Sequence, residues 1–244
     1  MGKHKKENLG WFEKASRWLG RFNYRIERAL LYWDPKKYWT DRGGDRYFEE
    51  QERHQSRNEK SDFLTDEISR LPVESILEIG CGYGKQLRNL RKKTTARLSG
   101  VDFSPTQLQK ARELGLEDIS VSEADARELP FPDEKFDLVF SSAVVLHHSP
   151  RNAAKILAEM IRVSKLYVVH NEDTNISSTR YGYDLFQVYK QLGFEIVKCC
   201  KIPFAVNPER TQFLIVRIPS ESRNVLTTDH IYPFVKSSIT SSVI

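Results

Sequence analysis

Cysteine is scarce in this chain, and long apolar runs are missing. The three cysteines, Cys81, Cys199 and Cys200, are too few for a disulfide framework and lack the paired spacing of a zinc site. No uncharged apolar run approaches the roughly 20 residues of a membrane-spanning helix, and the start of the chain leads into no apolar signal core. These features predict a globular protein of the cytoplasm that binds no metal.

The excess positive charge lies at one end of the chain. Residues 1–33 hold eight Lys and Arg against three Glu, a balance of +5, which equals the net charge of the whole chain. The remaining residues hold 38 − 8 = 30 basic and 33 − 3 = 30 acidic side chains, a balance of zero. Because nucleic-acid binding needs a basic surface on the folded domain, the neutral main body argues against a nucleic-acid partner.

Residues 9–33 have the pattern of one amphipathic helix. Apolar residues recur every three or four positions, and Lys and Arg occupy the opposite face. The helix should end at Asp34-Pro35, because proline has no N–H group and restricts the residue before it. Three interpretations of this helix remain open: a lid over an acceptor pocket, a helix that lies on a membrane surface, and a docking site for nucleic acid.

An aromatic and charged stretch with Tyr38 and Trp39 follows, and a second helical pattern covers residues 46–70. Together with helix 9–33 they form an N-terminal extension over residues 1–72. The Ser- and Thr-rich residues 219–244 have few large apolar side chains before Ile231, so we expect a disordered tail there.

Strands alternate with helices between residues 73 and 218, which predicts an α/β domain with a doubly wound, mostly parallel sheet. The last two strands are joined by a loop without a helix, so this pair should be antiparallel. The expected strands cover residues 73–79, 97–103, 119–122, 136–142, 166–170, 194–200 and 212–218, and the expected helices cover 85–93, 105–114, 152–163 and 181–192.

The first expected strand runs directly into a glycine-rich turn, Gly80-Cys81-Gly82-Tyr83-Gly84. Ligands of open α/β sheets bind at the carboxyl ends of the strands, where such a turn lets them approach the backbone closely. A nicotinamide-binding fold would need the spacing G-x-G-x-x-G, and its third glycine would fall on Lys85. The turn therefore argues against a bound dinucleotide.

With Glu78 two residues ahead of the turn, the sequence resembles the E/D-x-G-x-G-x-G motif of class I S-adenosylmethionine-dependent methyltransferases, in particular their small-molecule, type 11-like branch. Asp102 ends the second expected strand, where the resemblance implies a carboxylate that accepts from the ribose hydroxyls. Asp125 follows the third strand, where the family has an acid that contacts the adenine amino group. The resemblance covers about residues 73–218, and it implies S-adenosyl-L-methionine as cofactor, bound by Glu78, Gly80, Cys81, Gly82, Gly84, Asp102, Phe103, Asp125, Ala126 and Ser141.

The family's Lys-Pro-Gly-Gly turn before the fifth strand is missing, so the turn there should be shorter. The end of the fourth strand also lacks the Asn/Asp-Pro-Pro-Tyr sequence of amino-group methyltransferases and the Pro-Cys nucleophile of the cytosine C5 type, which argues against modification of nucleic-acid bases. His147 and His148 lie at this point, where they serve either to pack the cofactor or as a general base. Glu172, just after the expected fifth strand, and His170 at its end are further candidates for the base or for binding the acceptor.

We therefore expect a methyltransferase for a small-molecule acceptor or one linked to a lipid or glycan, with the extension covering the site and residues 9–33 as a peripheral membrane contact. Two alternatives stay open. One is an RNA or protein methyltransferase, and the other is a catalytically silent partner subunit that binds S-adenosylmethionine.

Overall fold

A computed structural model describes residues 24–116, 118–205, 207–219 and 226–239 of the chain. Within them lies a seven-stranded sheet with the strand order β3-β2-β1-β4-β5-β7-β6. β7 pairs antiparallel with both β5 and β6, whereas β1 to β5 pair in parallel. The predicted doubly wound sheet with an antiparallel end is confirmed. The strands are β1 Ser75–Ile79, β2 Arg97–Asp102, β3 Ser120–Glu123, β4 Phe136–Ser142, β5 Ser164–Asp173, β6 Glu195–Cys200 and β7 Thr211–Arg217.

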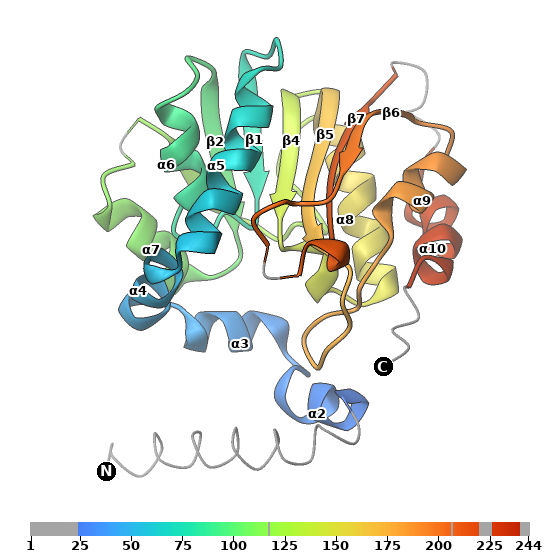
Figure 1. Cartoon of the computed structure of the whole chain (residues 1–244), viewed down its shortest axis with the longest axis horizontal. Coiled ribbons are helices and arrows are strands. Elements are labelled where there is room, and N and C mark those ends of the chain that lie inside the picture. Colours follow the sequence, from blue (N-terminus) through green and yellow to red (C-terminus); the bar gives the residue numbers. More distant parts are fainter. Residues whose placement is uncertain (1–23, 117, 206, 220–225, 240–244) are drawn as a thin grey trace.

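Helices cover both faces of this sheet (Figure 1). On one face, α5 (Gln55–Ser69), α6 (Lys85–Arg91) and α7 (Pro105–Glu113) share an apolar core that includes Leu64, Leu87 and Leu108. On the other face, α8 (Pro150–Val163), α9 (Leu185–Gln191) and α10 (Thr228–Ser237) share a second core that includes Leu157. β1 is buried along its whole length between these two layers, including its polar residues Ser75 and Glu78.

The extension differs from the predicted pair of long helices. Residues 9–23 of the predicted helix 9–33 lie outside the described residues, and α2 (Tyr24–Leu31) ends ahead of Asp34-Pro35 as expected. Pro35 then begins α3 (Pro35–Arg42), and the Asp34 carboxylate caps that helix by accepting from the Lys37 N–H.

The helix predicted over residues 46–70 is two helices, α4 (Asp45–Arg53) and α5, which meet at an extended His54. No proline or glycine marks this break. The carbonyl groups left free at the end of α4 accept from side chains of α5: Arg57 donates to the Glu50 carbonyl, and Asn58 donates to that of Glu52. Since only the folded arrangement brings these partners together, the local sequence pattern could not predict the turn.

The prediction of a disordered tail is wrong for residues 228–237. They form α10, which buries Ile231 and Val235 against the core shared with α8 and α9. The Thr227 hydroxyl and the His230 side chain cap the start of the helix. The Ser- and Thr-rich flanks conceal a short apolar helix face, and neighbouring helices are needed to bury it.

β5 is longer than expected, because α8 ends at Val163 and the strand begins at Ser164 with no loop between them. The short turn predicted here is in fact absent. The strand also continues through Asp173, so residues 171–173 belong to the sheet and not to a loop.

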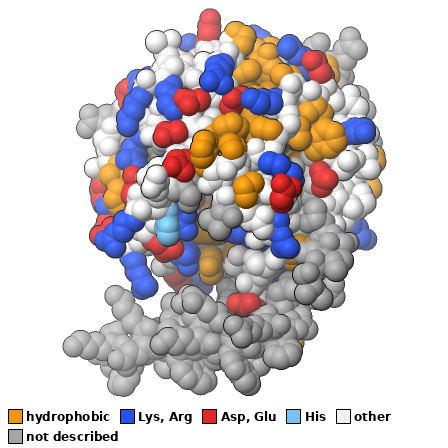
Figure 2. All heavy atoms as spheres, viewed as in Figure 1, with side chains coloured by type: hydrophobic (Ala, Val, Ile, Leu, Met, Phe, Trp, Pro, Cys, Tyr) orange, Lys and Arg blue, Asp and Glu red, His pale blue; other side chains and the backbone are white. Residues whose placement is uncertain are grey.

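On the face of the molecule shown in Figure 2, basic and acidic side chains are intermixed. None of the described helices combines the length and apolar character needed to cross a bilayer.

Candidate active site

A cavity of about 420 Å³ opens at the carboxyl ends of β1, β2, β4 and β5, and we call it the central cavity. Its floor includes Glu78, the turn from Gly80 to Tyr83, and Asp102. The loop after β4 contributes His147 and His148. α3 crosses beneath the ends of the strands (Figure 1), and side chains of the extension form the opposite wall.

Glu78 is a buried acidic residue in the central cavity. Its side chain is buried, and its Oε2 atom has no hydrogen-bond partner among the described residues. Burial, together with the nearby charge of Asp102, raises the pKa of Glu78 well above its usual value. A buried carboxylate with a free oxygen calls for a cationic or hydrogen-bond-donating ligand.

Asp102, at the end of β2, ties the glycine-rich turn to the next helix. One carboxylate oxygen accepts from the Gly82 N–H at 2.9 Å, and the other accepts from the Ser104 N–H at 2.8 Å. Burial raises its pKa, while these hydrogen bonds lower it. Ser104 itself caps α7, as its position before Pro105 predicts. Asp102 thus fixes the turn and also presents a carboxylate to the central cavity.

Gly80 must be a glycine for two reasons. Its φ of +64° lies in the left-handed region, and a Cβ atom there would come within 2.5 Å of Val144 Cγ2. The turn after β1 therefore packs closely against the loop after β4, which carries His147.

The extension contributes a wall that the family motifs do not mark. Tyr38, Trp39 and Arg42 of α3, Tyr47 of α4 and Lys60 of α5 are among the residues that line the central cavity. Tyr38 and Trp39 stood out in the sequence as an aromatic pair, and the expectation that the extension covers the site is consistent with this wall. For the others, the sequence held no signal beyond their location in the extension.

Glu52 of α4 connects this wall to the glycine-rich turn. Its Oε1 atom accepts from the Tyr83 hydroxyl at 3.1 Å and from Arg88 at 3.0 Å, and it lies 3.8 Å from Lys85 Nζ. One carboxylate therefore links α4 to the turn and to the first turns of α6.

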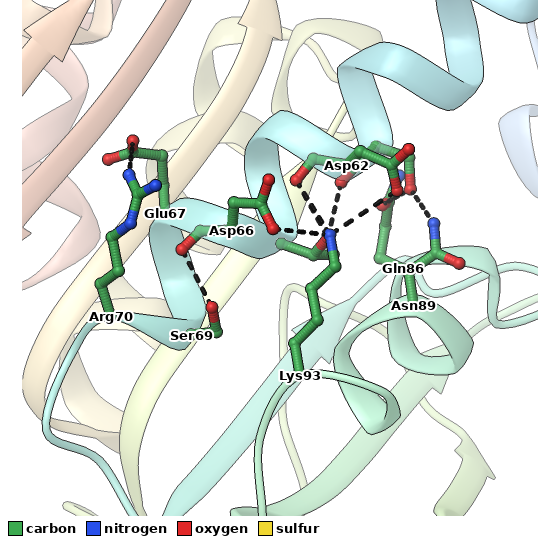
Figure 3. A network of polar contacts seen from close by, with 10 residues as sticks. Asp62, Asp66, Glu67, Ser69, Arg70, Gln86, Asn89 and Lys93 are labelled. Carbon is green, nitrogen blue, oxygen red and sulfur yellow. Dashed lines mark hydrogen bonds and ion pairs between the residues drawn. The ribbon is translucent and has the colours of Figure 1, made fainter.

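A second polar network joins α5 to α6 (Figure 3). Lys93, just after α6, points toward the end of α5 and makes ion pairs with Asp62 and Asp66. Nearby, the Ser61 hydroxyl donates to Gln86 and accepts from Asn89. α5 thus supports the helix that follows the glycine-rich turn.

Both candidate histidines line the central cavity, where His147 is buried and His148 is partly buried. His147 Nδ1 lies 2.6 Å from the Thr179 carbonyl oxygen, so Nδ1 carries the proton and Nε2 has the free lone pair. Burial lowers the pKa of His147 to about 3 and that of His148 to about 4, so both rings are neutral at physiological pH. The His147 ring lies edge-on to Trp39, with the ring centroids 5.0 Å apart.

Glu172 and Ser141 do not line the central cavity, contrary to the roles predicted for them. Both lie buried on adjacent strands, where the Ser141 hydroxyl donates to Glu172 at 2.8 Å. The Glu172 carboxylate also accepts from the backbone N–H groups of Val144, Val145 and Leu146. Burial raises the pKa of Glu172 to about 7, and these donors oppose the rise. Because its oxygens already accept from the loop that carries His147, Glu172 is placed to shape that loop.

The predicted cofactor residues divide into two groups. Glu78, Gly80, Cys81, Gly82, Asp102 and Phe103 line the central cavity. Gly84, Asp125, Ala126 and Ser141 do not: Gly84 is the N-cap of α6, and Ala126 is packed in the core. The Asp125 carboxylate is instead paired with Arg127, with its closest oxygen 2.5 Å from the guanidinium.

Part of the chain is similar in sequence to known methyltransferases. Residues 76–166 match a family model described as "Methyltransferase domain". Methyltransferase GfsG of Streptomyces halstedii is 35% identical over 114 residues, which are 43% of this chain and 40% of the relative. Tocopherol O-methyltransferase of Arabidopsis thaliana is 34% identical over 106 residues, which are 41% of this chain and 30% of the relative. The chain thus spans less than half the length of the relatives it matches.

Solved structures agree with this match at the level of the fold. Phosphoethanolamine N-methyltransferase 1 of Haemonchus contortus, in complex with phosphoethanolamine and S-adenosylhomocysteine, has a TM-score of 0.64 at 18% identity, covering 88% of this chain and 54% of that one. Magnesium protoporphyrin IX methyltransferase of Synechocystis with bound S-adenosylmethionine has a TM-score of 0.60 at 16% identity, covering 76% and 98%.

Residues 76–166 therefore match a methyltransferase domain, and the chain is similar in sequence and fold to class I S-adenosylmethionine-dependent methyltransferases. The cofactor of this class fits the central cavity by its chemistry. Its ammonium group matches the free oxygen of the buried Glu78, and its ribose hydroxyls match the carboxylate of Asp102.

Proposed function

We propose that this protein transfers a methyl group from S-adenosylmethionine to a small-molecule acceptor. The observation that carries the proposal is the buried Glu78 carboxylate, whose free oxygen lies beside the glycine-rich turn and Asp102 at the ends of the strands. The family match and the methyltransferase names of the relatives support it.

In this proposal, Glu78 binds the ammonium group of the cofactor and Asp102 accepts from its ribose hydroxyls. Phe103, next along the chain, lines the same part of the cavity and provides an apolar surface for the adenine. Asp125 contributes only if its pairing with Arg127 opens.

When bound, the cofactor supplies a methyl group already activated by its sulfonium, so the chain has to position the acceptor and take up its proton. His147 is the residue placed to hold that proton. Its Nδ1 donates to Thr179, which keeps the Nε2 lone pair available, and it is neutral at physiological pH. Its low pKa makes it a weak base, sufficient only for an acceptor whose proton is released easily.

A lipid-linked acceptor is the finer form of this proposal. Ile26, Leu30 and Trp33, spaced three and four residues apart, are exposed by 55%, 56% and 73%. Exposed apolar side chains in a basic segment are what peripheral binding to a membrane requires. In a flotation assay with vesicles that contain anionic lipid, the protein should be found with the vesicles in the top fraction. A variant with Ile26, Leu30 and Trp33 changed to Ser should remain in the bottom fraction.

Isothermal titration with S-adenosylhomocysteine tests the cofactor site. Asp102→Ala and Glu78→Gln should each weaken binding by roughly tenfold or more, because each removes a charge-assisted contact. Asp229→Ala is the matched control: its carboxylate is exposed on α10 and pairs with Arg151. Unchanged affinity in both site variants would refute the proposed cofactor site.

Transfer of labelled methyl groups into cell extract then separates the remaining functions. Label in a small-molecule or lipid fraction supports the proposal, whereas label in RNA or protein favours those acceptors. A protein that binds the cofactor and labels no fraction is a silent partner subunit. RNA binding that weakens steeply with salt would accompany the RNA alternative.

A further inference from the structure

The acceptor side of the central cavity has a basic wall, formed by Arg57 and Lys60 of α5 and Arg180 in the loop after β5. Arg57 and Lys60 are three residues apart, so they lie on one side of their helix. Asp173, the last residue of β5, lies between the two elements: one oxygen is 3.5 Å from Lys60 Nζ and the other 3.3 Å from the Arg180 guanidinium.

The carboxylates near this wall are too few to neutralise it. Asp173 is shared by Lys60 and Arg180, and Glu50 is shared by Arg42 and Arg57 at 3.8 and 4.0 Å. Four basic side chains therefore face two carboxylates, 4 − 2 = +2. All four distances exceed the roughly 2.7–2.9 Å of a strong charge-assisted hydrogen bond. Arg57 and Arg180 each also donate from Nη1, to the Glu50 carbonyl and to Asn175, but a guanidinium has five N–H donors, so each has more donors than these contacts use.

The cofactor does not remove this excess. S-adenosylmethionine has a sulfonium, an ammonium and a carboxylate, so it adds one net positive charge to the cavity wherever its carboxylate binds. Glu78 and Asp102, the other two carboxylates that line the cavity, are those matched to the cofactor. A neutral or cationic acceptor would leave the basic wall uncompensated in a partly buried site, which is costly.

A neutral group beside the wall points to a second feature of the ligand. Asn171, two residues before Asp173, is buried and lines the central cavity. Its Nδ2 donates to the Ser142 hydroxyl at 2.9 Å, but its Oδ1 has no partner among the described residues. A buried carbonyl oxygen of this kind needs a hydrogen-bond donor.

We propose that the acceptor has a carboxylate or phosphate group that binds among Arg57, Lys60 and Arg180, and a hydroxyl or amine that donates to Asn171 Oδ1. This inference rests on the proposed methyltransferase function and adds the charge of the acceptor to it. The anionic group would then bind beside α5 and the donor near the end of β5, in the cavity that His147 also lines.

Titration with two simple anions, inorganic phosphate and benzoate, tests the basic wall. Each is titrated into the full chain with and without saturating S-adenosylhomocysteine. We expect millimolar binding of at least one, and Lys60→Gln or Arg180→Gln should weaken it roughly tenfold. Arg53→Gln is the matched control, because Arg53 is exposed by 77% and pairs with Glu49 away from the cavity. The preferred anion distinguishes a phosphate from a carboxylate acceptor.

Binding of neither anion, or equal binding by Lys60→Gln and Arg53→Gln, would overturn the inference. Mass spectrometry of the labelled product from extract should also find a carboxylate or phosphate group, and a product with neither would likewise overturn it. Failures of the two proposals can be told apart. If the chain binds an anion but does not bind S-adenosylhomocysteine, the basic wall is supported and the methyltransferase function is refuted.

Discussion

The Ser141 hydroxyl at the end of β4 donates to the Glu172 carboxylate of β5 at 2.8 Å. Ser141 also pairs with His170 Nδ1, and His170 Nε2 pairs with the Tyr189 hydroxyl, both at 2.8 Å. Because Ser141 donates its only proton to Glu172, it accepts from His170, whose Nε2 then accepts from Tyr189. A buried chain of four polar groups therefore ends in a carboxylate that binds the backbone of the loop carrying His147.

Glu172→Gln should destabilise the fold by about 1–3 kcal/mol, because an amide group cannot accept from all the donors that surround Glu172. Urea unfolding measures this loss. If Glu172 shapes the loop, the variant should keep the pH profile of methyl transfer while losing rate. Loss of a titration near pH 7 from the rate profile, with stability unchanged, would instead identify it as the catalytic base.

Gly80→Ala should cost more stability than Gly115→Ala. Both residues have a left-handed φ, +64° at Gly80 and +74° at Gly115, so each alanine costs about 1–2 kcal/mol in backbone strain. Only at Gly80 would the new Cβ also meet Val144, whereas nothing lies within 4 Å at Gly115. Equal free energies of unfolding for the two variants would contradict the close packing inferred at Gly80.

Stability should fall as the pH drops below 6.5, and His170 should account for part of the fall. Burial lowers the pKa of His170 to about 3, so between pH 6.5 and 3 the unfolded chain binds a proton that the folded chain does not. At pH 5 this one group should cost about 2 kcal/mol relative to pH 7.5. His170→Asn, compared at both pH values by urea unfolding, should lose less stability on acidification than the wild-type protein. An equal loss would show that His170 is not the source.

Glu52→Gln should weaken S-adenosylhomocysteine binding about three- to tenfold and leave the fold stable, since it loosens α4 from Tyr83 and Arg88 beside the cofactor turn. Titration calorimetry measures the change. Glu49→Gln, on the same helix, removes an exposed pair with Arg53 and should bind normally. Identical affinities would mean that the extension does not support the turn.

The sequence was sufficient for the sheet and for the floor of the central cavity, because both depend on local patterns. The glycine-rich turn that begins at Gly80 and the carboxylate of Asp102 can each be recognised from a few neighbouring residues. Glu172 could not be assigned in the same way. Its partner Ser141 lies 31 positions earlier, and only the pairing of β4 with β5 brings the two together.

The sequence could not predict the basic wall either, because residues far apart in the chain form it. Arg57 and Lys60 look like the solvated face of a charged helix, and Arg180 looks like a loop residue. Their meeting depends on how α5 packs on the sheet, through Leu64 and Ile68, and on the unexpected length of β5, which places Asp173 at the cavity.

The network between α5 and α6 in Figure 3 couples the extension to the helix that follows the glycine-rich turn. Lys93 pairs with Asp62 and Asp66 of α5, and Ser61 of α5 contacts two side chains of α6, so detaching the extension at α5 would break these contacts and loosen the helix that follows the glycine-rich turn. Backbone amides of the two helices should then exchange with deuterium as one cooperative unit, slower and later than those of α2.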